Sequence, residues 1–80
     1  MIQIELVYYP EENPDPTSLL AYRAPIVPRV GETLMLDAED ADTRGLCPRW
    51  EVVDVLYNLP AQGGDVVSAV VYVEPAEDDV

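Results

Sequence analysis

The chain has 80 residues, which predicts one domain, residues 1–80, with a small core. Sixteen acidic and four basic residues give a net charge of −12, and a surface this negative repels nucleic acids and anionic lipids. The absence of histidine and the single cysteine exclude an intrachain disulfide and disfavour a zinc site or an imidazole-assisted nucleophile. We therefore expect a protein that is not an enzyme and holds no cofactor.

Residues 2–9 alternate apolar and polar side chains, which predicts a strand with one buried face. Three prolines and three acids make residues 10–16 a solvated loop. Residues 17–27 are ambiguous. Ser18 suits the cap of one helical turn, but Pro25 would end that turn, and an extended segment fits equally well.

Gly31 follows a proline and precedes the short apolar segment 33–36, so we expect a turn that opens a strand. A single glycine beside Glu32, with no lysine in the chain, does not suit a phosphate-binding loop. Residues 37–48 are predicted to form a long acidic loop.

Residues 49–57 predict the next strand, but the apolar alternation is imperfect. In a regular strand the charged Asp54 would lie on the same face as the apolar Trp50 and Val52. Either both faces are partly covered or a bulge shifts the pattern. Gly63 and Gly64 suit the turn of a hairpin, and the valine-rich segment 66–74 predicts the last strand. The expected fold is all-β, either a small SH3-like barrel or a strongly curved antiparallel sheet of four to five strands.

Three stretches, "PRVGETLML", "WEVVDV" and "VVSAVVYVEP", resemble the small SH3-like β-barrel modules of bacterial and phage proteins. The resemblance starts at Pro28 and covers about half to two thirds of the chain. It implies a role in binding or assembly, and the small acidic phage-encoded modules include inhibitors of host defence proteins. The long acidic loop and the proline-rich insertion depart from the simplest pattern.

The start of the chain has no basic segment or long apolar run, so we expect no secretion signal, no membrane span and a cytoplasmic location. Carboxylates near strands, such as Glu32 and Asp54, could in principle act as an acid–base pair, but 80 residues leave little room for a cleft. The acids from Asp37 to Asp42 do not follow the spacing of a calcium loop.

The acids are better suited to contact a protein partner that has a basic surface. Carboxylates spaced along the chain could imitate phosphates, and tyrosines could anchor the contact. The predicted partner-binding residues are Glu11, Glu12, Asp15, Asp37, Glu39, Asp40, Asp42, Tyr9, Tyr57 and Tyr72.

The expected function is therefore that of a protein-binding module, in its sharper form a phage-derived acidic inhibitor that mimics nucleic acid and occupies a basic surface of a host protein. One alternative is a structural or assembly subunit that forms homo- or hetero-oligomers through strand edges, for example a homodimer. The other is a barrel that binds a small ligand or calcium. High acidity can also serve solubility alone.

Overall fold

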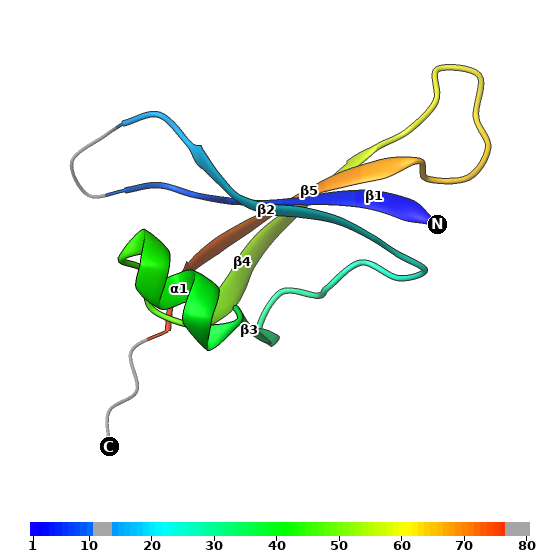
Figure 1. The fold of residues 1–80 in the computed structure, drawn as a ribbon. Coiled ribbons are helices and arrows are strands. Elements are labelled where there is room, and N and C mark those ends of the chain that lie inside the picture. The colour runs from blue at the N-terminus through cyan, green and yellow to red at the C-terminus, as the bar shows by residue number, and fades with distance from the viewer. Residues whose placement is uncertain (11–13, 77–80) are drawn as a thin grey trace.

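The computed structural model describes residues 1–10 and 14–76, which form one five-stranded sheet and one short helix (Figure 1). The strands follow the spatial order β2-β1-β5-β4-β3. In chain order the elements are β1 (Ile2–Tyr8), β2 (Thr17–Ala24), β3 (Thr33–Met35), α1 (Ala38–Arg44), β4 (Arg49–Asn58) and β5 (Ser68–Pro75). Of the ambiguous segment 17–27, residues 17–24 are thus a strand.

The sheet curls into a half-barrel, which confirms the prediction of an all-β, strongly curved sheet. The pairs β1–β2, β3–β4 and β4–β5 are antiparallel, as predicted, but β1 and β5 run parallel at the centre of the sheet. The prediction of an antiparallel sheet throughout was wrong for this pair. A parallel neighbour requires a long connection, and here the whole chain between β1 and β5 provides it.

The core lies on the concave face of the sheet and is centred on Trp50, of which 2% is exposed. The indole Nε1 donates a 2.8 Å hydrogen bond to the carbonyl of Cys47, and its ring contacts that of Tyr8 at a centroid distance of 5.2 Å. Alternating residues of the three central strands and one residue of β2 surround it. The buried members of the cluster in these strands are Ile4, Leu6, Leu19, Val52, Val71 and Val73.

A bulge in β4 explains the broken alternation of its sequence, so that the second of the two expectations is confirmed. The pairing with β5 shifts between Val52 and Asp54, and Val53 is the inserted residue. Because of this extra residue, Val55 rather than Asp54 continues the inward-facing series of Trp50 and Val52.

The segment predicted to be a long acidic loop contains the helix α1, so that prediction was wrong. The Asp37 side chain caps the helix by accepting a 2.9 Å hydrogen bond from the backbone N–H of Glu39. Gly45 ends it in the left-handed conformation, at φ 69°. The helix buries Ala41 against the core.

The turn at Gly31 is as predicted. Gly31 has φ 94°, a conformation that favours glycine, and its N–H donates a 2.9 Å hydrogen bond to the carbonyl of Val52. The Val52 N–H in turn donates to the carbonyl of Glu32 at 2.9 Å. The turn therefore extends the pairing of β3 with β4 and fixes where β3 begins.

Candidate functional site

The predicted partner-binding residues are spread over several parts of the fold. Asp37 caps α1, while Glu39, Asp40 and Asp42 lie on it, all four with exposed side chains. Asp15 is exposed in the connection that enters β2. The predictions for Glu11 and Glu12 fall outside the described residues.

The acids of α1 gather at one end of an elongated molecule of 45 × 26 × 22 Å. Figure 1 shows α1 at the end of the sheet where β1 and β5 finish. The helix is fastened there by Arg44, whose Nη1 donates a 2.6 Å hydrogen bond to the carbonyl of Leu19. Two of these acids, Glu39 and Asp40, also lie in the first turn, where negative charge stabilises a helix.

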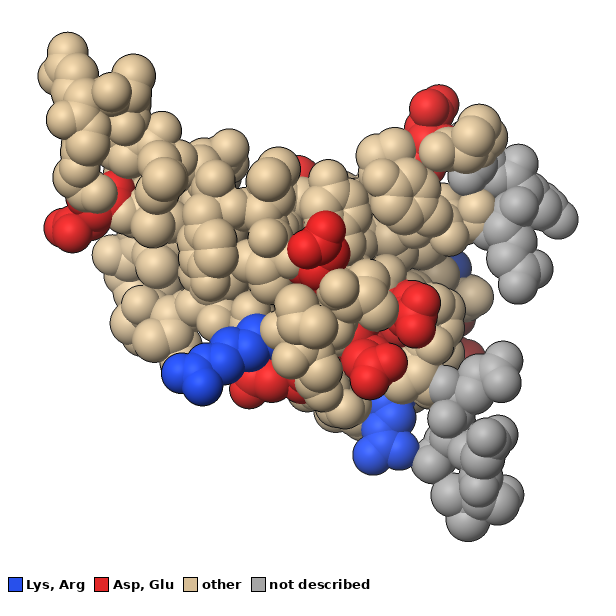
Figure 2. Space-filling model, turned by 180° about the vertical axis from the view of Figure 1, so that it is seen from behind, with Lys and Arg blue, Asp and Glu red and all other residues tan. Residues whose placement is uncertain are grey.

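Figure 2 shows that the back of the molecule is largely uncharged and carries both acidic and arginine side chains, some of them next to each other. Within the sheet, Glu51 of β4 lies directly opposite Glu74 of β5. Residues opposite each other in an antiparallel pair share a face, so these two carboxylates are neighbours. Like charges in this position are unfavourable.

Tyr9 and Tyr72 form the second predicted group, and the structure brings them together. Their rings are nearly parallel, with an interplanar angle of 8° and centroids 6.1 Å apart. Tyr72 lies in β5 between Val7 of β1 and Asp54 of β4, and Tyr9 directly follows the end of β1. Side chains from opposite parts of the chain thus build one aromatic wall.

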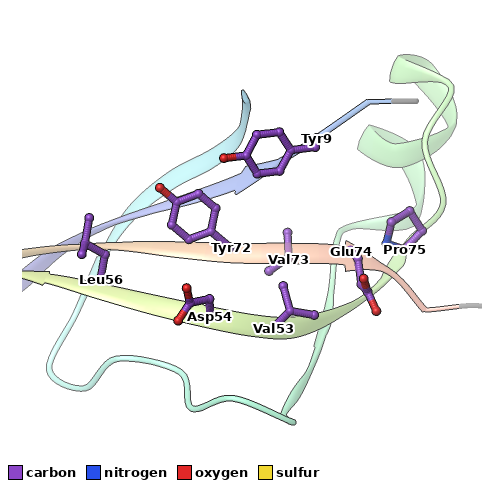
Figure 3. Close-up of a pocket in the computed structure, with 8 residues that line it drawn as sticks. All are labelled: Tyr9, Val53, Asp54, Leu56, Tyr72, Val73, Glu74 and Pro75. Atoms are coloured by element: carbon purple, nitrogen blue, oxygen red, sulfur yellow. The ribbon is translucent and has the colours of Figure 1, made fainter. Parts of the chain in front are cut away.

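A shallow hollow of about 560 Å³ lies against this wall. Figure 3 shows the two tyrosine rings side by side, with Asp54 and Val53 across from them on β4. Neither Arg nor Lys lines the hollow. Its lining consists of Tyr9, Val53, Asp54, Leu56, Tyr72, Val73, Glu74 and Pro75.

The bulge in β4 shapes the hollow. In a regular strand Val53 and Asp54 would face opposite sides, but both line the hollow here. The Asp54 Oδ1 also accepts a 2.9 Å hydrogen bond from the backbone N–H of Val55. The carboxylate is therefore held beside the aromatic wall.

Tyr57 lies apart from the other two tyrosines. It sits near the end of β4 and is not among the residues that line the hollow. The sequence prediction missed six lining residues as partner contacts, among them Asp54, Leu56 and Glu74. The broken parity at Asp54 was a signal for the lining residues on β4, because it indicated the bulge at Val53.

The described residues offer little for catalysis or metal binding. The only cysteine, Cys47, is half-buried, and its thiol lies 3.3 Å from the carbonyl of Arg49. Among residues 1–10 and 14–76, no three carboxylates or thiols converge as metal ligands. Burial raises the pKa of the Tyr22 hydroxyl above its ordinary value of 10.0. Within those same residues, no helix has the length and apolar character needed to cross a membrane.

Comparisons of the chain with protein-family models, with curated proteins and with solved structures gave no match. The resemblance to SH3-like modules therefore stays a prediction from the sequence, and function has to be argued from the surface itself.

Proposed function

We propose that the protein is a non-enzymatic protein-binding module that contacts a basic surface of its partner with the end that carries α1 and the hollow. In its sharper form this is an inhibitor that imitates nucleic acid, as the resemblance to acidic phage modules implies. The acids supply long-range attraction, and the tyrosines supply contact area.

The observation that carries this proposal is that both groups lie toward one end of the molecule, α1 on the core face of the sheet and Tyr72 and Glu74 on the opposite face. β1, which Tyr9 directly follows, and β5, which carries Glu74, both finish at the end of the molecule where α1 lies (Figure 1). A partner that covers this end would meet exposed carboxylates on the helix and, on the sheet, an aromatic hollow that also carries Asp54 and Glu74. Charged surroundings around a less polar centre are common at protein interfaces.

The non-enzymatic part of the proposal is supported by composition and by the shape of the hollow. Without histidine, neither Cys47 nor a serine has an imidazole to activate it. The hollow is open and is lined by two carboxylates without a nucleophile beside them. A surface of this kind suits contact better than bond cleavage.

The test is retention of a partner from a lysate of the source organism on the immobilised protein. A variant with Glu39→Gln, Asp40→Asn and Asp42→Asn should lose the partner, because neutralising these acids removes the attraction. A matched variant with Glu5→Gln, Glu32→Gln and Asp65→Asn has the same net charge but an intact α1, and should retain it. Equal retention by both variants would show that the helix does not contact the partner.

Mimicry of nucleic acid makes a further demand on the purified partner. Its affinity for the protein should fall steeply between about 50 and 500 mM salt, because several ion pairs are screened at once. Duplex DNA or RNA should also compete with the protein. A partner that binds at high salt and ignores nucleic acid rules out mimicry but leaves protein binding in place.

The open edge of β4 favours an assembly subunit as a second candidate. β3 pairs only with residues Arg49 to Glu51 of β4, so most of β4 has no neighbour on that side among the described residues. Exposed apolar side chains lie on this strand, including Leu56 and Tyr57. An assembly subunit should show a mass that rises with concentration in light scattering, and a constant mass contradicts this role.

A further inference from the structure

We infer, on the basis of the function proposed above, that the hollow beside Tyr9 and Tyr72 binds an arginine side chain from an extended segment of the partner. A guanidinium group has three properties that are complementary to this surface: a flat face, a positive charge and several hydrogen-bond donors. Each matches a feature of the lining residues.

The flat face matches the aromatic wall. The rings of Tyr9 and Tyr72 lie in nearly parallel planes, and Tyr9 is 57% exposed, so ring surface is open to a ligand. A guanidinium group stacks on a tyrosine face and gains from the negative charge of its π system. Val53 and Leu56 complete the hollow and can contact the aliphatic stem of the same side chain.

The positive charge matches the carboxylates. Asp54 and Glu74 line the hollow, and Glu51 lies opposite Glu74 in the sheet, so a third acid lies next to the two that line it. Arg49, the basic residue nearest to them on β4, does not line the hollow. A guest cation would be attracted by these carboxylates.

Arginine fits better than lysine. The planar guanidinium can stack on Tyr72 while its edge donates hydrogen bonds to Asp54, the residue opposite on β4. An ammonium group is more strongly hydrated and cannot present a flat face. We therefore expect selectivity for arginine rather than for positive charge alone.

The experiment is a titration followed by NMR chemical shifts, with a short capped peptide that contains one arginine between two prolines. Three control peptides replace the arginine with citrulline, lysine or alanine. Citrulline keeps the shape but removes the charge. We expect shifts at Tyr9, Val53 and Tyr72, with affinity at least about threefold weaker for lysine and about tenfold weaker for citrulline.

Variants then test the contact residues. Tyr9→Ala and Glu74→Gln should each weaken arginine binding by about three- to tenfold, because one removes ring surface and the other a charge. The matched controls Tyr57→Ala and Asp65→Asn should leave it unchanged, since neither residue lines the hollow. Proton–nitrogen spectra of each variant show whether it folds.

Equal binding of the arginine and citrulline peptides, or shifts confined to α1, would overturn the inference. The outcome is distinct from that of the lysate experiment, because the peptide needs no natural partner. If the protein binds the arginine peptide but retains no partner, the arginine site is supported and the proposed function is rejected. If the protein retains a partner but binds the arginine and citrulline peptides equally, the arginine site is rejected and the proposed function stands.

Discussion

Arg44, the last residue of α1, donates its hydrogen bond to the carbonyl of Leu19, the residue that β2 leaves out of its pairing with β1. The pairing passes from Leu20 to Ser18, and the guanidinium also lies 3.5 Å from the Ser18 carbonyl. The Arg44 side chain thus binds a backbone carbonyl at the irregularity of β2 and holds the seven-residue helix against this edge strand.

Replacing Arg44 should therefore destabilise both α1 and the edge strand β2. We expect Arg44→Ala to lower the free energy of unfolding by about 1–2 kcal/mol, because a charged hydrogen bond is lost at a partly exposed site. Urea denaturation measures this. Arg23→Ala, which removes an exposed arginine from the same strand, should cost less than about 0.5 kcal/mol. Equal losses would mean that the contact with Leu19 contributes nothing.

Trp50 should be the most sensitive position of the core. Trp50→Phe should cost about 1–3 kcal/mol, since the Cys47 carbonyl loses its donor. Trp50→Ala should cost about 3–5 kcal/mol by leaving a large cavity, which is a substantial part of the stability of a small domain. Circular dichroism in urea follows both variants without relying on the fluorophore. A Trp50→Ala variant as stable as the wild type contradicts this account of the core.

Asp54 should also protect the open edge of β4. Its carboxylate accepts the Val55 N–H, and a charge at an edge discourages pairing with another chain. We expect Asp54→Val to self-associate more than the wild type as concentration rises, seen as a growing mass in sedimentation velocity. Asp54→Asn keeps an acceptor and a polar group, so its mass should follow that of the wild type. Identical behaviour of all three chains would exclude a protective role.

Tyr22 should make the protein less stable in alkaline solution. Burial raises the pKa of its hydroxyl, so the unfolded chain releases this proton at a lower pH than the folded one. This contribution to stability is intact below the ordinary pKa of 10.0 and is lost as pH rises through the folded-state pKa.

Urea denaturation of the wild type and of Tyr22→Phe, at about pH 8 and about pH 11, isolates this effect. The loss of stability between the two pH values should be smaller in the variant, because phenylalanine has no proton to release. Equal losses in the two proteins would show that Tyr22 does not contribute.

Much of the sheet followed from local patterns, because burial on one face leaves a period of two in the sequence. β1 shows this clearly, and the broken parity around Asp54 indicated the bulge in β4. The helix α1 was missed because it is too short to show a helical period and buries only Ala41. Its capping pattern was readable, with Asp37 before the first turn and Gly45 after the last.

The candidate site was only partly predictable. Tyr9 and Tyr72 were both expected to contact a partner, yet nothing in the sequence placed them side by side. Their contact depends on the parallel pairing of β1 with β5, and strands so distant in the chain leave no local signal of which neighbours they choose. The carboxylates of the hollow depend on the same pairing and on the bulge.

The central position of β5 has a consequence for how the chain acquires its fold. During synthesis β1 and β2 emerge first and can pair as a hairpin, but the strand that lies between β1 and β4 emerges last. Until then the apolar core-facing side chains of β1 are exposed to solvent. Closing the long loop between β1 and β5 is slow. The nascent polypeptide is therefore exposed to aggregation until translation has passed Ser68 and the last strand can insert.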